Sequence, residues 1–206
     1  TADDVDRAVA AGRGAGCDWV LAVGGGAVLD CGKAAAGMVT NPGSLTDYLE
    51  GVGSGRAMER APQPMIAVPT TAGTGSEVTK NAVISGPGYK KSVRSPLLIP
   101  AVALVDPELI AGAPAPVLAS CGMDALTQLL ESYLSVGASP VTDGLALQGL
   151  EAAGRSLRRL VDSEAGDADA RVDMALASLL GGICLANAGL GAVHGFASPL
   201  GALHPI

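Results

Sequence analysis

Aromatic residues are scarce in this chain of 206 residues, which has one Trp, one Phe and three Tyr. Charged residues are also few, at 16 %, whereas 49 % of the residues are hydrophobic; this excludes a disordered chain and predicts a packed interior. Lys and Arg form no cluster and the formal net charge is −7, so we expect no nucleic-acid partner. No run approaches the roughly 18 consecutive apolar residues that cross a membrane, so we expect no membrane partner.

The four cysteines lack the paired spacing of a zinc ribbon or a disulfide framework. They stand at positions 17, 31, 121 and 184, without a C-x-x-C pair. Reduced thiols and a cytoplasmic location are the simpler interpretation. The chain begins at Thr1 instead of Met and ends at Ile206, and we expect both ends to be truncated.

The first half of the chain predicts alternating helices and strands. Helical sequence is followed by a short apolar run, three glycines and a second helical stretch, which is typical of a parallel α/β layer. The expected helices span 3–16 and 27–38, and the expected strands span 19–23, 65–68, 81–85 and 102–105.

The second half predicts helices alone. From 116 to 199 there is little strand signal and much helical periodicity. The predicted fold class is therefore α/β followed by all-α. An α/β domain with a parallel sheet would span 1–108, and an all-helical domain would span 109–206, both of them partial.

Two glycine-containing loops follow predicted strands. Gly24-Gly25-Gly26 ends one strand and opens a helix, where unpaired N–H groups and the helix dipole favour a phosphate. The loop from Thr70 to Ser76 follows the next strand and gathers hydroxyl groups around two glycines. Parallel α/β sheets bind ligands at the carboxyl ends of their strands, so together these loops predict a cofactor site.

Two named fingerprints fail in this sequence. A Walker A loop needs four residues between its first Gly and Gly-Lys, followed by Ser or Thr, but Gly26 and Gly32-Lys33 enclose five residues and Ala34 follows. This makes a phosphotransferase a weak alternative. The glycines at 12–16 precede the strand and are better interpreted as a helix terminator than as a Rossmann turn.

Three residues suggest a metal site. Asp124 and Gln128 lie four residues apart and project from one helix face, and His194 follows another glycine turn. A buried carboxylate such as Asp124 needs a partner or a metal. Asp and His are suitable ligands for Zn²⁺ or Fe²⁺, although two ligands do not complete a site and a lone His is more often structural.

Four segments together resemble the iron-containing (group III) alcohol dehydrogenase family of the dehydroquinate synthase-like superfamily. Their order and spacing match this family along essentially the whole chain. The segments are GGGAVLD at 24–30, PTTAGTGSEVT at 69–79, GMDALTQLLESY at 122–133 and GLGAVHGFASPLGA at 189–202.

The resemblance implies that 1–108 is a partial dinucleotide-binding domain and 109–206 a partial metal- and substrate-binding domain, with the site in the cleft between them. The cofactor is expected to be NAD or NADP, and the metal Fe²⁺ or Zn²⁺. The residues expected to contact the cofactor are Gly25, Gly26 and Asp30 at its pyrophosphate and nicotinamide end, Thr70, Thr71 and Thr74 at its adenine and ribose portions, and Lys90 at the nicotinamide-side ribose. Asp124 and His194 are the expected metal ligands and catalytic residues.

Three departures from the family pattern affect the expected metal ligands and a proton-relay or cofactor-contacting group near the substrate. The family usually has a His where this chain has Gln128, and an amide is a poorer ligand for either metal. A second His of the family is replaced by Ser198. A last ligand His belongs to a Pro-His-Gly motif that would begin directly after Ile206. Relatives such as glycerol dehydrogenase manage with three protein ligands.

The resemblance implies metal-assisted hydride transfer between NAD(P)H and a small aldehyde or ketone, and hence an alcohol or aldehyde as the small-molecule partner. One alternative is a metal-free, maleylacetate-reductase-like enzyme, in which Gln128 and Ser198 would bind the substrate. Another is an inactive fragment of a dehydrogenase. The choice between NAD and NADP depends in such folds on an earlier strand. It stays open here, as does whether the chain forms a homo-oligomer.

Overall fold

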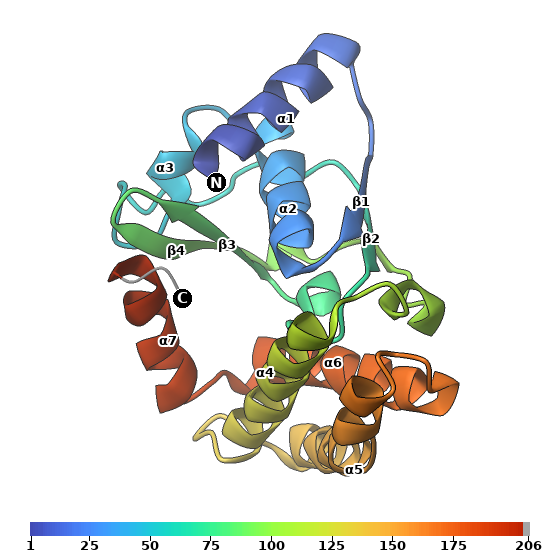
Figure 1. Ribbon diagram of the computed structural model, residues 1–206. Helices are drawn as coiled ribbons and strands as arrows, with labels where there is room; N and C mark the ends of the chain where they lie inside the picture. The colour runs from blue at the N-terminus through green and yellow to red at the C-terminus, as the bar shows by residue number, and fades with distance from the viewer. Residues whose placement is uncertain (204–206) are drawn as a thin grey trace.

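Three short parallel strands form the main sheet. The computed structural model describes residues 1–203, apart from the side chain of Ser198. The strands are β1 (Val20–Gly24), β2 (Met65–Pro69) and β5 (Val102–Ala103), in the order β1-β2-β5. In the register of β1 and β2, Val20 lies beside Met65 and Gly24 beside Pro69, so both strands end at the same edge of the sheet (Figure 1).

Helices α1 (Ala2–Ala15) and α2 (Gly26–Thr40) cover this half of the molecule. Helix α2 packs against β1 and β2, and α1 packs on α2. Thr1 caps α1 through a capping box, and the helix ends at Gly16, which adopts a left-handed backbone with φ of 63°. The glycines of this segment therefore terminate a helix, as predicted.

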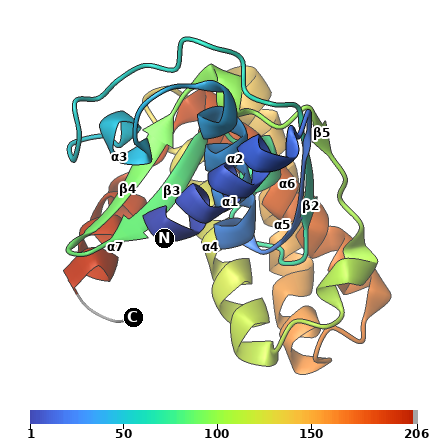
Figure 2. The same cartoon turned by 90° about the horizontal axis from the view of Figure 1, so that it is seen from above.

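A two-stranded antiparallel hairpin lies beside the main sheet. Strand β3 (Asn81–Gly86) pairs with β4 (Tyr89–Arg94), which the sequence did not indicate because three of its six residues are basic. The inward-facing side chains of the hairpin, Ala82, Ile84 and Val93, are buried. A short helix, α3 (Leu45–Tyr48), lies between α2 and β2, where the sequence predicted neither a helix nor a strand (Figure 2).

Four helices make the second half. Helices α4 (Ala115–Tyr133), α5 (Pro140–Asp162) and α6 (Ala168–Ala188) pack on one another around buried side chains such as Leu129, Leu160 and Met174. Helix α7 (Ala192–Leu203) leaves this bundle and lies against β4 (Figure 1). The predicted class, α/β followed by all-α, is confirmed.

Short 3₁₀ helices complete the chain: η1 (Ser76–Val78), η2 (Pro96–Leu98) and η3 (Pro107–Ile110). The predicted strand over 102–105 is reduced to its first two residues, and the expected domain boundary at 108 and 109 lies inside η3. Within residues 1–203 no single helix is long and apolar enough to cross a membrane, although α6 and α7 together, bent by 90°, pass that test by length and composition.

The two halves meet where the loop after β2 packs against α4 and α6. Gly75 has a left-handed backbone with φ of 59°, and it lies directly against Gly182 of α6. A Cβ atom on Gly182 would lie 2.8 Å from Gly75 Cα, and a Cβ atom on Gly73 would lie 2.8 Å from Cys121 Cβ of α4. Glycine at these positions therefore permits a backbone contact that no other residue allows.

We expect Gly182→Ala to destabilise the protein by about 1–3 kcal/mol, because the added methyl group overpacks a backbone contact. The matched control is Gly154→Ala in α5, where a Cβ atom meets nothing within 4 Å. This control should raise stability by up to about 1 kcal/mol through helix propensity. Urea unfolding measures both changes, and equal stability of the two variants would contradict the close contact.

Candidate functional site

The two glycine loops lie in contact at the carboxyl ends of β1 and β2. Thr70 N donates to Gly24 O at 3.0 Å, which joins the loops at their start. A Cβ atom on Gly25 would lie 3.3 Å from Thr71 Oγ1, and one on Gly26 would lie 2.7 Å from Thr74 Oγ1. The threonines of the second loop therefore stand over the glycines of the first, and the expected crevice at the sheet edge is present.

The amino terminus of α2 opens into this crevice. Gly25 is its N-cap, and it has no side chain that could accept hydrogen bonds from the N–H groups of the first turn. The N–H groups of that turn and the helix dipole favour an anion at this position. This arrangement is chemically suited to a phosphate group.

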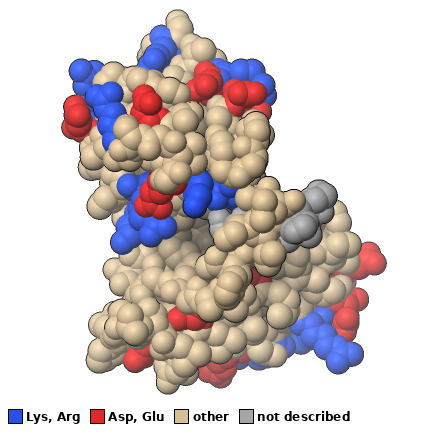
Figure 3. Space-filling view, turned by 90° about the vertical axis from the view of Figure 1, so that its left-hand side faces the viewer, with Lys and Arg blue, Asp and Glu red and all other residues tan. Residues whose placement is uncertain are grey.

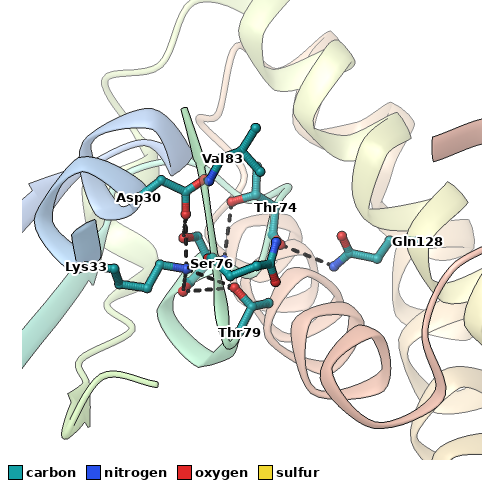
Figure 4. A network of polar contacts seen from close by, with 8 residues as sticks. Asp30, Lys33, Thr74, Ser76, Thr79, Val83 and Gln128 are labelled. Carbon is teal, nitrogen blue, oxygen red and sulfur yellow. Dashed lines mark hydrogen bonds and ion pairs between the residues drawn. The ribbon is translucent and has the colours of Figure 1, made fainter. Parts of the chain in front are cut away.

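Asp30, which we expected at the cofactor, is held by the protein itself (Figure 4). Its Oδ1 accepts a hydrogen bond from Ser76 Oγ at 2.5 Å and lies 3.0 Å from Lys33 Nζ. Its Oδ2 accepts from Val83 N at 3.0 Å. Asp30 thus connects α2 to the second loop and to β3.

Lys33 completes this network. Its ammonium group donates to Ser76 O at 2.9 Å, to Thr79 Oγ1 at 2.9 Å and to Asn81 O at 2.5 Å. The side chain is fully buried, and burial lowers the pKa of Lys33 while Asp30 and Glu77 oppose that shift. Burial likewise raises the pKa of Glu77. The network fixes the backbone on which the second loop ends.

The candidate metal ligands come together from two helices. Asp124 lies on α4 and His194 on α7, and His194 Nε2 is 3.1 Å from Asp124 Oδ1. The other ring nitrogen, Nδ1, lies 2.5 Å from Oε2 of Glu131, which also projects from α4. Asp124 and His194 are therefore in contact, as expected.

His194 lies between two carboxylates, and this sets its charge. The hydrogen bond with Asp124 raises the pKa of His194, burial opposes the shift and the bond with Glu131 adds to it. Burial raises the pKa of Glu131, but hydrogen bonds from His194, Val193 and Gly191 outweigh it and lower the pKa below its usual value. Because ionised carboxylates only accept hydrogen bonds, this geometry favours an imidazole that donates from both nitrogens when no metal is bound.

The donor types at this position fit a divalent metal. A carboxylate oxygen and an imidazole nitrogen 3.1 Å apart can both bind one ion through bonds of about 2.1 Å. Such binding would displace the proton from Nε2. The described part of the chain supplies only these two ligands, and within it no group of three His, Cys, Asp or Glu could hold a metal. The Pro-His-Gly motif expected after Ile206 lies outside the described residues.

Gln128 faces the second glycine loop. Its amide Nε2 donates to Thr74 O at 3.2 Å, and the residue is only 2 % exposed. The amide therefore links α4 to the loop that carries Thr74 (Figure 4). This bond uses the amide nitrogen and does not involve Oε1, the atom through which an amide would bind a metal, so the expectation that Gln128 weakens the metal site stays a prediction.

A cleft of about 600 Å³ joins the two parts of the site. Figure 3 shows the hollow between the two halves, with Lys and Arg side chains gathered along one rim. The predicted residues that line it are Gly26, Asp30, Thr74, Lys90, Asp124, Gln128 and His194. Gly25, Thr70 and Thr71 lie beside it at the strand ends. The side chain of Ser198 lies outside the described residues.

Sequence reasoning missed Glu131 and the structural roles of Lys33, Ser76 and Thr79. Glu131 had a signal, because it lies seven residues after Asp124 and hence on the same face of α4. Lys33 was considered only as a phosphate-binding residue. Its position three residues after Asp30 could have indicated an ion pair on α2.

Comparison with known proteins identifies the relatives of this chain. The family model described as iron-containing alcohol dehydrogenase matches residues 1–107, and the model of the C-terminal part of that family matches residues 118–206. Long-chain-alcohol dehydrogenase 1 of Geobacillus thermodenitrificans is 45 % identical over 95 % of this chain and 49 % of the relative. The 4-hydroxybutyrate dehydrogenase of Cupriavidus necator is 44 % identical over 97 % of this chain and 52 % of the relative.

Solved structures agree with these matches. Sulfoacetaldehyde reductase from Bifidobacterium kashiwanohense, in complex with NAD⁺, superposes with a TM-score of 0.92 at 35 % identity, over all of this chain and 54 % of that one. A 1,3-propanediol oxidoreductase superposes with a TM-score of 0.92 at 38 % identity, over all of this chain and 53 % of that one. The chain spans about half the length of the relatives that it matches.

We expect Lys33→Met to lower the free energy of unfolding by about 3–5 kcal/mol, because Asp30 and two backbone carbonyls lose a buried cationic partner. Lys91→Met, at an exposed position on β4, is the control and should change it by less than about 0.5 kcal/mol. Both values come from urea unfolding at neutral pH. A loss for Lys33→Met no larger than that of the control would contradict the role of the network.

Proposed function

This chain belongs to the iron-containing alcohol dehydrogenase family, and we propose that it carries the dinucleotide and metal residues of an NAD(P)-dependent oxidoreductase. The enzyme interconverts a small alcohol and its aldehyde or ketone. One observation carries the proposal: Asp124 and His194 converge, with Nε2 and Oδ1 3.1 Å apart, on the same cleft that Gly26 and Thr74 line.

The dinucleotide binds along the edge of the sheet. Gly25 and Gly26 leave room for the pyrophosphate at the amino terminus of α2, where the helix dipole stabilises negative charge. Thr70, Thr71 and Thr74 contact the adenine and ribose portions, and Lys90 reaches the ribose beside the nicotinamide. These positions lie within residues 1–108, which we assign to the dinucleotide-binding domain.

In this proposal Asp30 does more than contact the cofactor. All its hydrogen-bonding partners in the network come from α2, η1 and β3. It lines the cleft while it holds the second loop at the position where the cofactor passes. Its contribution is to keep the loop ordered before the cofactor binds, which reduces the cost of ordering on binding.

Residues 109–206 supply the metal and substrate side. Asp124 and His194 are the ligands present, and a divalent metal, Fe²⁺ or Zn²⁺, would supply Lewis-acid polarisation of the substrate oxygen, worth several kcal/mol. Asp124 and His194 fix where that oxygen lies, and the cleft walls hold the nicotinamide against it and exclude water.

The proposed substrate is a small alcohol or its carbonyl form, and relatives of this chain differ in the alcohols for which they are named. Their names include a long-chain alcohol, 4-hydroxybutyrate and 1,3-propanediol as substrates. A metal-free reductase is the second candidate, and Gln128 favours it, because an amide stands where the family usually has a metal-binding His. Metal analysis separates the two candidates.

The metal half of the proposal predicts a selective loss in Asp124→Asn and His194→Ala. Both variants should lose stoichiometric Zn²⁺ or Fe²⁺ in elemental analysis and lose alcohol oxidation by roughly 10³-fold, which corresponds to about 4 kcal/mol. Their affinity for NADH, measured by fluorescence titration, should stay within a few-fold of the unaltered protein. Asp162→Asn, at the exposed end of α5, is the control that should leave metal content and rate unchanged.

The dinucleotide half predicts the reciprocal loss in Gly26→Ala. The added Cβ atom would lie 2.7 Å from Thr74 Oγ1 and would push apart the two loops between which the dinucleotide is proposed to bind. NADH affinity should fall at least tenfold while the metal content stays unchanged. A metal-free unaltered protein that still oxidises an alcohol would establish the second candidate. An unaltered protein that binds neither metal nor NADH would contradict both.

A further inference from the structure

Glu131 contacts His194 from the side opposite Asp124. It lies on α4, seven residues after Asp124, and is only 9 % exposed. Its Oε1 accepts from Val193 N at 2.6 Å, and its Oε2 lies 2.5 Å from His194 Nδ1 and 3.4 Å from His194 N. One carboxylate therefore holds both the ring and the backbone of His194.

The same carboxylate caps a helix to which it does not belong. Helix α7 begins at Ala192, so Val193 and His194 lie in its first turn, where N–H groups have no partner within the helix. A negative charge at this end is also favoured by the helix dipole. Glu131 thereby fixes where α7 starts and how it is rotated relative to α4.

The position of the ring follows from these contacts. Two carboxylates compete for the imidazole protons. Glu131 Oε2 lies 2.5 Å from Nδ1, whereas Asp124 Oδ1 lies 3.1 Å from Nε2. The side chain of Glu131 is also more buried, at 10 % exposed against 35 % for Asp124. A neutral imidazole therefore keeps its proton on Nδ1. The lone pair on Nε2 then faces Asp124 Oδ1, which lies 3.1 Å away.

We propose that Glu131 is a positioning residue that fixes the tautomer and the orientation of His194, so that Nε2 is the nitrogen available to a divalent metal. The inference rests on the proposed metal site. A carboxylate behind a ligating histidine raises the basicity of the ligand and fixes the ring, and its removal typically costs about 10–100-fold in metal affinity.

The rival explanation is that Glu131 serves only to cap α7. Glu131→Gln separates the two roles, because the amide keeps the shape and an oxygen acceptor for the N–H groups but loses the charge. Glu131→Ala removes both roles. Glu151→Gln, an exposed glutamate on α5, is the matched control.

The first measurement is Zn²⁺ binding to the purified apo protein by calorimetry. We expect Glu131→Gln to weaken binding by about 10–100-fold, with NADH affinity and thermal unfolding close to those of the unaltered protein. Co²⁺ bound in its place should show a changed visible absorption spectrum. The Glu151→Gln control should match the unaltered protein. Equal Zn²⁺ affinity of Glu131→Gln and the unaltered protein would overturn the proposal.

The second measurement needs no metal. The sequence contains two histidines, so ¹⁵N NMR at alkaline pH resolves the ring of His194, with His194→Ala for assignment. We expect the proton on Nδ1 in the unaltered protein and a shift toward the other tautomer in Glu131→Gln. If this shift occurs although the unaltered protein binds no metal, the positioning role holds and the metal assignment fails. If metal binds but the tautomer is unchanged by Glu131→Gln, the positioning role fails.

Discussion

The buried ammonium group of Lys33 holds together the part of the molecule on which the candidate site is built. It binds the backbone of Ser76 and Asn81 and the hydroxyl of Thr79, and it pairs with Asp30 one turn earlier on α2. A cation taken out of water is costly unless several partners compensate it, so the four contacts form or fail as a unit. They determine where the loop after β2 lies.

That loop is held from its other side by the helical half. Gly75 lies against Gly182 of α6, and Thr74 O accepts from Gln128 of α4. Thr74 also stands over Gly26, so one residue contacts the start of α2 and the helix that carries Asp124. These contacts therefore hold the loop after β2 in place between the two halves. The distance from the glycine loop to the candidate metal ligands is set by these packing contacts.

Much of this arrangement could be predicted from the sequence, since local signals determined it. The glycines at 24–26 and the loop after β2 were placed at strand ends by alternating apolar runs and breakers, and the periodicity after residue 115 gave the helices. Strand β4 was missed because Lys90 and Lys91 replace the apolar residues that mark a strand. Its pairing with β3 had a local signal, the Pro87-Gly88 turn between the two strands, which we did not use to predict a hairpin.

The roles of Asp30 and Glu131 were beyond local reasoning. The partners of Asp30 include Ser76 and Val83, 46 and 53 residues away, and the partner of Glu131 is 63 residues away on α7. Spacing on one helix shows which residues share a face, but it does not show what that face meets. The contact between Asp124 and His194 was expected only because the resemblance to a family supplied it, and their role as metal ligands stays a prediction.

The central claim is that one cleft brings a dinucleotide and a metal together between the sheet edge and α4. The most direct test is anomalous diffraction from crystals of the protein grown with Zn²⁺ and NAD⁺. The account predicts a metal peak in contact with Asp124 Oδ1 and His194 Nε2, and a pyrophosphate at Gly25 and Gly26. A dinucleotide bound elsewhere, or a metal peak away from Asp124 and His194, would contradict it.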